Sequence, residues 1–218
     1  ERAQDTEERV GLLLRLGNLH EEKLGQPELA LVRYRSALTI QPGNRNVHAA
    51  LERYLDAASP YRGEVAEVLL PVYENDDSPE RVARALEVLR AAESDAERRL
   101  DHDRRLFEIY RDMTETQASF HTGLRVFAAR PDDGDMRKQL FVQAEELSRF
   151  EELVAVYEKA LVDEAGLLDA FLKRMLSGEV AGIYEHKVGR PTEAEVAWRR
   201  VLEVDEGNEN AFDALERL

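Results

Sequence analysis

Residues 16–44, LGNLHEEKLGQPELALVRYRSALTIQPGN, decide the fold of this chain. In the first half, apolar residues recur at helical spacing, and Gly17 lies on the resulting stripe without a side chain. Gly25 suits the left-handed position after a helix, and Pro27 suits the first turn of the next helix. A second apolar stripe follows, at Ala30, Leu31, Tyr34, Ala37 and Leu38. The stretch therefore predicts two antiparallel helices that approach closely at Gly17.

This helix pair resembles the tetratricopeptide repeat (TPR), whose signature positions are filled here by Leu16, Gly17, Ala30, Tyr34, Ala37 and Pro42. The match departs from the family at His20, where a Tyr is usual, and by one extra residue between Gly17 and Gly25. The resemblance implies an all-α fold, a right-handed superhelix or TPR-like solenoid of about twelve antiparallel helices. Long, degenerate bacterial arrays are the most similar members of the family.

The pattern returns further along the chain. Gly25-Gln26-Pro27 recurs as Gly189-Arg190-Pro191, and the same offset, which we call the internal shift, takes Gly43-Asn44 to Gly207-Asn208. Leu124 and Trp198 are expected to be the copies of Tyr34. Within each copy a further hairpin starts about 34 residues on, which matches the TPR period. These recurrences predict one repeat array over residues 1–218.

The array is predicted to contain three repeat units, at about 6–58, 95–148 and 167–218. An extra helix at about 60–75 lies near the irregular place of the stack, and Pro71 is expected to kink or end it. Connecting helices are expected at about 78–93 and 149–165. In the weakest copy, Phe107 and Phe127 replace small packing residues, so its helices are expected to lie further apart or to cross at another angle. Asp135 is expected to cap the helix that ends near Ser148.

Composition excludes several classes of function. The net charge of −15 disfavours nucleic acid as a partner and allows a basic peptide or helix. With no Cys, disulfides and thiolate metal sites are excluded. No apolar run approaches the roughly 20 residues of a membrane span, and no signal peptide is visible. We expect a cytoplasmic protein without membrane insertion, excised from a longer array.

Catalytic chemistry has no support in the sequence. It contains no Gly-rich phosphate loop, nucleophile elbow or H-E-x-x-H motif, so we expect no enzyme, no cofactor and no metal. Residues 101–103, Asp-His-Asp, point in different directions on a helix and are interpreted as a solvated face. His20 and His48 lie near apolar stripes and are expected to be hydrogen-bonded core or boundary residues.

The resemblance implies a role in binding other proteins. The first helix of each hairpin would line a concave face, where an extended peptide or a partner helix could lie. The residues expected on that face are Asn18, Glu22, Arg104, Glu108, Arg111, Lys138, Val142, Glu145, Glu179 and Glu185. Two alternatives remain open: a structural spacer that self-associates through its uncapped terminal hairpins, and an enzyme or metal protein.

Overall fold

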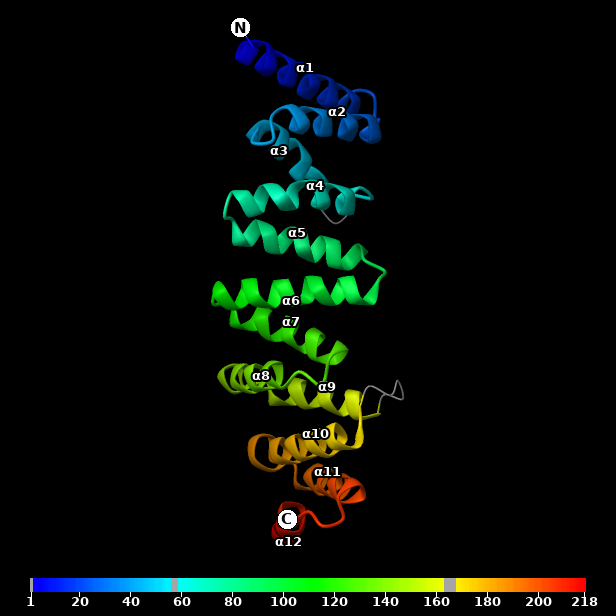
Figure 1. Ribbon diagram of the computed structural model, residues 1–218, viewed down its shortest axis with the longest axis vertical. Coiled ribbons are helices and arrows are strands. Elements are labelled where there is room, and N and C mark those ends of the chain that lie inside the picture. The colour runs from blue at the N-terminus through cyan, green and yellow to red at the C-terminus, as the bar shows by residue number, and fades with distance from the viewer. Residues whose placement is uncertain (1, 56–58, 163–167) are drawn as a thin grey trace. The chain divides into compact units, whose positions relative to one another are not determined.

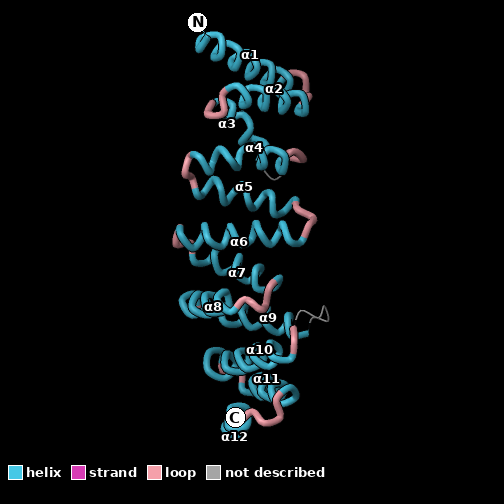
Figure 2. Tube along the Cα trace, in the orientation of Figure 1, coloured by secondary structure: helices cyan, strands magenta, loops and turns pink. Residues whose placement is uncertain are grey.

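The computed structural model describes residues 2–55, 59–162 and 168–218, and this part of the chain consists of helices and loops without a strand (Figure 2). It divides into two compact units, residues 1–102 and 103–218. Unit 1 contains α1 (Arg2–Glu22), α2 (Pro27–Ile40), α3 (Arg45–Glu52), a short 3-10 turn η1 (Arg53–Leu55), α4 (Arg62–Asn75) and α5 (Pro79–Ala92). Helix α6 (Ala96–Asp112) spans the boundary between the units.

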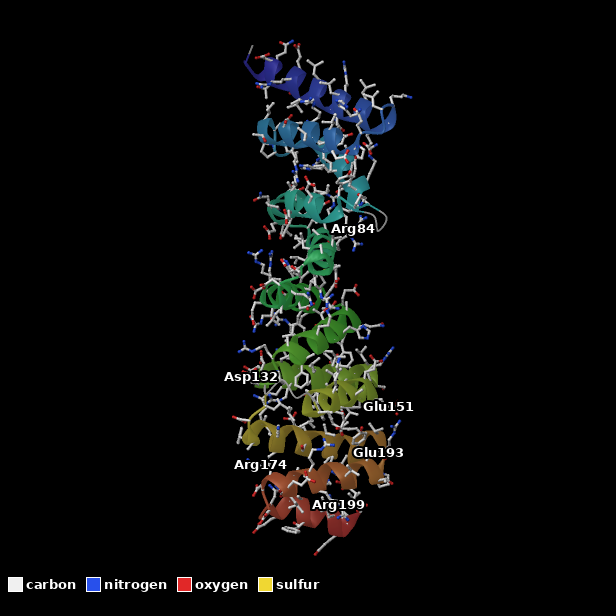
Figure 3. The ribbon with its side chains drawn as sticks, turned by 90° about the vertical axis from the view of Figure 1, so that its right-hand side faces the viewer. Arg84, Asp132, Glu151, Arg174, Glu193 and Arg199 are labelled. Atoms are coloured by element: carbon white, nitrogen blue, oxygen red, sulfur yellow. The ribbon has the colours of Figure 1, made fainter. Side chains whose placement is uncertain are left out.

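Unit 2 continues with α7 (Thr116–Ala129), α8 (Gly134–Leu147), α9 (Phe150–Val162), α10 (Ala170–Ile183), the π-helical turn η2 (Tyr184–Val188), α11 (Pro191–Val204) and α12 (Glu209–Arg217). Within each unit, helices that follow one another in sequence lie side by side (Figure 1). Arg190, which precedes α11, links α9 to α11: it pairs with Glu151 of α9 at 2.6 Å and with Glu193 of α11 at 3.8 Å. Both acids lie on one side of unit 2 (Figure 3). The expected fold class is confirmed in the described residues: it is all-α and built from antiparallel helix hairpins.

Five hairpins share one turn. One to three positions after the end of each first helix comes a residue with positive φ, and one further residue precedes the second helix. The positive-φ residues are Gly25, Asp77, Thr114, Ser148 and Gly189. This left-handed position lets the chain reverse and satisfies the last carbonyls of the first helix. At positions 25 and 189 the residue is glycine, which indicates the left-handed turn already in the sequence. At the other three positions a side chain occupies a conformation that suits glycine better.

Replacing Thr114 with Gly is expected to raise the free energy of unfolding by about 1 kcal/mol, because Thr114 is β-branched and held at φ 58°. Thermal denaturation followed by circular dichroism measures the change. The matched control is Thr116→Gly, which places glycine in the first turn of α7 and should lower stability. An unchanged or lower midpoint for Thr114→Gly would contradict the shared turn.

The extra residue before Gly25 is absorbed by a widened last turn of helix. The Leu24 amide donates to the carbonyl of Leu19 at 3.2 Å, one position further back than in an α-helix, and the Gln26 amide reaches the carbonyl of His20 at 2.8 Å. The copy at 184–190 does the same, since η2 is π-helical and the Arg190 amide donates to Tyr184 at 2.9 Å. The departure from the family spacing is therefore a local π-turn that leaves the hairpin intact.

A second turn type leads from one hairpin to the next. It starts at Gln41, Arg130 and Asp205 with φ of −138°, −139° and −139°, and it ends at the N-caps Asn44, Asp133 and Asn208. The prediction that Asp135 caps α8 is wrong: the Asp133 carboxylate accepts from the amides of Asp135 and Met136, at 3.1 and 3.0 Å. An N-cap side chain reaches the second and third amides after it, which places the cap before Gly134.

Aligned on these caps, the structural copy of Tyr34 in the middle repeat is Gly123, one position before the expected Leu124. In unit 1, a Cβ on Gly17 would lie 2.2 Å from the Tyr34 ring. In unit 2 the sizes are exchanged: Phe107 is large, and a Cβ on Gly123 would lie 3.0 Å from its ring. The absence of a side chain at Gly123 therefore leaves room for the Phe107 ring.

Helices α4 and α5 form one of the five hairpins, and α4 continues through Pro71 to Asn75 instead of ending there. Pro71 is exposed, so its ring faces solvent. The expected helix ends at 58 and 165 and the start at 167 lie outside the described residues. The proposed repeat boundaries remain predictions.

Candidate functional site: a groove formed by α6, α7 and α8

A hollow bordered by three of the predicted binding residues lies in unit 2. It has a volume of about 400 Å³ and is lined by Arg111, Thr114, Thr116, Ser119, Lys138, Gln139, Val142, Gln143 and Glu146. We refer to it as the α8 groove. The end of α6 and the start of α7 form one wall through the turn at Thr114, and one face of α8 forms the other. A shared hairpin turn therefore sets the shape of the hollow.

The floor of the α8 groove combines an exposed apolar side chain with a buried polar pair. Val142 is 54% exposed. The Gln143 side-chain amide donates to the hydroxyl of the fully buried Ser119 at 2.9 Å. Its other polar atom, Gln143 Oε1, is buried and has no hydrogen-bond partner in the described part of the chain. A buried acceptor without a donor costs free energy, so turning the Gln143 side chain toward the hollow, where it could meet a ligand N–H, would be favoured.

The rim of the α8 groove carries both signs of charge. Arg111 pairs with Glu108 and donates to Asp112 at 3.1 Å, and the latter hydrogen bond raises the pKa of Arg111. Lys138 pairs with Asp135 at 3.3 Å, with its side chain 82% exposed. These exposed pairs contribute little to stability, so the cations can exchange partners at low cost.

Glu145 borders a separate hollow on the other side of α8. It accepts from Lys187 of η2 at 2.5 Å. The ammonium nitrogen of Lys187 also lies 5.6 and 5.4 Å from the ring centroids of Phe141 and Phe150. Cation–π contact and the ion pair thus join α8, α9 and η2. Glu145 therefore has a structural partner in the folded chain.

The side chain of Glu185 is almost completely buried and joins three elements. Its carboxylate accepts from Trp198 Nε1 at 3.2 Å and from Arg217 at 2.6 Å. Burial acts to raise the pKa of Glu185, but the hydrogen bonds from Arg217 and Trp198 outweigh it and hold that pKa below its usual range. Its role in this chain is to tie η2, α11 and α12 together.

Glu179 lies 3.4 Å from the buried Arg137. Burial raises the pKa of Glu179 above its usual range, although the guanidinium acts in the opposite direction. Arg137 also donates to the carbonyl of Pro131 at 2.8 Å. Glu179 thus balances a buried cation inside unit 2 and does not line the α8 groove.

The two predicted residues of unit 1 belong to a cluster that repeats the one around Glu185. The Tyr34 hydroxyl donates to Asn18 and Glu21, at 2.8 and 2.7 Å. Arg53 then pairs with Glu21 at 2.7 Å and with Glu22 at 3.8 Å. The internal shift takes Glu21, Tyr34 and Arg53 onto Glu185, Trp198 and Arg217, which form the same arrangement. This agreement supports the internal copy at the level of individual contacts.

Of the predicted binding residues, the structure brings together Arg111, Lys138 and Val142 in the α8 groove, with Glu108 beside Arg111. Arg104 is exposed on α6 away from the lining. Sequence reasoning missed Gln139, Gln143 and Glu146. Together with Val142 they follow the threes and fours of one helix face, so helical spacing from Lys138 and Val142 could have found them.

Other chemistry has little support. Within the described residues, no group of three or more His, Asp or Glu side chains is placed to hold a metal ion. The interpretation of residues 101–103 as a solvated face is wrong for Asp103, which is buried and accepts from Arg125 at 2.7 Å. His48 is buried and bonds the Pro42 carbonyl at 2.6 Å, as expected for a core histidine. No helix in the described residues is long and apolar enough to cross a membrane.

No protein-family model and no curated protein matches the sequence. Among solved structures, the crystal structure of MamA protein aligns over 91% of this chain and 93% of that chain, at 18% identity and a TM-score of 0.36. A thermophilic TPR protein of Thermus thermophilus aligns over 95% of this chain and 97% of its own, at 16% identity and a TM-score of 0.33. Since both TM-scores lie below 0.5, these similarities carry no argument about function.

Proposed function

We propose that this chain is a protein-interaction scaffold, related to degenerate bacterial TPR arrays, and that its α8 groove binds a segment of another protein without catalysis. The buried Gln143 Oε1 without a donor, next to the exposed Val142, is the observation that carries this proposal. An apolar side chain of the partner would cover Val142. The Gln143 side chain would turn toward the hollow and accept from a backbone or side-chain N–H of the partner. Burial of apolar surface and the new hydrogen bond both favour the bound state.

The charge of the molecule indicates the kind of partner. A protein with a net charge of −15 draws basic partners over long distances. Glu146 on the groove lining provides an acceptor for a basic side chain of the bound segment. We therefore expect a peptide or a helix that carries an apolar residue next to a basic one.

Selection from a displayed random-peptide library against the whole chain tests the α8 groove. Peptides selected on the wild type are expected to lose at least about tenfold in affinity for Val142→Asp, which corresponds to about 1.4 kcal/mol. A carboxylate at that position would leave the apolar anchor without its contact. Fluorescence anisotropy with labelled peptides measures the affinities.

Val196→Asp is the matched control for Val142→Asp, since Val196 is 56% exposed on α11 and does not line the groove. Binding to this control should be unchanged. Selected peptides that bind wild type and Val142→Asp equally, or a library that gives no binder, would contradict the proposed function.

Self-association is a second candidate function, because apolar residues are exposed on the first and the last helix of the chain. Leu16 of α1 is 42% exposed and Phe212 of α12 is 50% exposed. Exposed apolar residues that gather on one face mark interaction surfaces.

A further inference from the structure

Helix α1 carries an apolar stripe that the described residues of unit 1 leave exposed. Leu12, Leu16 and Leu19 are 59%, 42% and 46% exposed, and their spacing places them on one face of the helix. We call these three residues the α1 stripe. Helix α2 lies beside α1 (Figure 1). The expectation that Gly17 lies on the apolar stripe is wrong, because Gly17 is buried against Tyr34 of α2 whereas the stripe is exposed.

The chain contains two copies of this face: all three positions are buried on α10, and two of three are buried on α4, where Val72 at the position of Leu19 is half-buried. The internal shift takes the α1 stripe to Leu176, Val180 and Ile183 of α10, which are 0%, 0% and 2% exposed. Helix α10 packs against α9 as well as α11, so a preceding helix is present. Alignment of α1 with α4, allowing for the widened last turn of α1, takes Leu12 and Leu16 to Val65 and Leu69, which are 1% and 0% exposed.

The element that precedes α4 has its own copy at the other end of the chain. Helix α4 packs against α3 and η1, and the Tyr73 hydroxyl of α4 donates to Glu52 of α3 at 2.9 Å. The internal shift takes α3 onto α12. The N-cap of α3 is Asn44, and the N-cap of α12 is its copy Asn208. The α3–α4 junction has two surfaces. The α3 surface has its copy on α12, and the α4 surface has its copy on α1.

The surface of α12 is also uncovered. Phe212 and Leu218 are 50% and 43% exposed, whereas the residues at the same positions of the earlier copy, His48 and Tyr54, are 6% and 7% exposed. We call Phe212 and Leu218 the α12 face. The α12 face resembles the α1 stripe, since both are apolar and the corresponding residues of an internal copy are buried.

We propose that the α12 face of one copy of this chain docks on the α1 stripe of a second copy, repeating the α3–α4 junction between molecules. This proposal is independent of the α8 groove. The contact is heterologous, so each bound copy leaves one free stripe and one free face, and the assemblies grow with concentration. Because few side chains take part, the contact lies at the weak end of protein interfaces.

Sedimentation velocity of the purified chain between about 10 µM and 1 mM tests the proposal, because weak contacts of this size associate in that range. The weight-average mass of the wild type should rise with concentration. Leu16→Asp should stay monomeric because its stripe is blocked, and Phe212→Asp should stay monomeric because its face is blocked. Both changes fall on exposed side chains, and circular dichroism checks that each variant is folded.

The decisive sample is an equimolar mixture of Leu16→Asp and Phe212→Asp. One intact stripe and one intact face remain between the two variants, so the mixture should form dimers and nothing larger. Val196→Asp is the control and should associate like the wild type. A monomeric wild type, a monomeric mixture, or a Phe212→Asp variant that still associates would overturn the proposal, and the last result would show pairing between two α1 stripes instead.

Discussion

Gly17→Leu is expected to lower the free energy of unfolding of unit 1 by about 3 kcal/mol. The first added carbon would lie 2.2 Å from the Tyr34 ring. That ring cannot move aside at low cost, because it is fully buried and its hydroxyl is held by Asn18 and Glu21. Burial and the hydrogen bond to Glu21 raise the pKa of Tyr34, so the phenol keeps its proton and donates at neutral pH.

Urea denaturation followed by circular dichroism measures the effect of Gly17→Leu. Gly11→Leu on the same helix is the matched control, since no atom lies within 4 Å of a Cβ built on Gly11. The control should be neutral or slightly stabilising, because leucine favours helix more than glycine does. Equal effects at the two positions would show that α1 and α2 do not meet at Gly17.

Phe127→Ala is expected to lower the stability of unit 2 by about 3 to 5 kcal/mol, the usual cost of removing a buried aromatic ring. Phe127 is fully buried and stacks on Tyr157, with the ring centroids 4.3 Å apart and the planes 22° from parallel. The cavity would lie between α7 and α9, which pack against each other.

Phe171→Ala is the control for Phe127→Ala, because Phe171 is 63% exposed and its removal leaves no buried cavity. A change of less than about 0.5 kcal/mol is expected there. Thermal denaturation of both variants provides the comparison. A small effect of Phe127→Ala would contradict the packing of α7 on α9.

The fold could be predicted from the sequence where glycine and proline mark the turns. Gly25 and Pro27 mark the start of the second helix of the first hairpin and Pro42 marks its end, and α2 spans Pro27–Ile40 in the structure. The same turn at Thr114 was not recognised, because threonine does not announce a left-handed conformation. The sequence did not reveal the exchange of sizes between Phe107 and Gly123 for a different reason. Each of these residues alone departs from the repeat signature, and only their contact across two helices shows that one compensates for the other.

The binding residues could be predicted only in part, because helical spacing gives a face and not the partners on it. Arg111, Lys138 and Val142 line one groove. Glu185 was placed on the binding face by the same helical spacing, yet it pairs with the Arg217 guanidinium of a later helix. Partners that lie on another helix cannot be found from one helix alone. The copied cluster at Glu21 and Arg53 gives a signal for such pairs once the internal shift is known.

Amide chemical shifts measured while a groove-selected peptide is added test the central claim most directly. Binding in the α8 groove should shift the side-chain amide signals of Gln139 and Gln143 and the backbone amide of Val142, because all three line the hollow. The signals of α1 and α12 should stay in place. Shifts confined to those two helices, or to residues outside the α8 groove, would contradict the account.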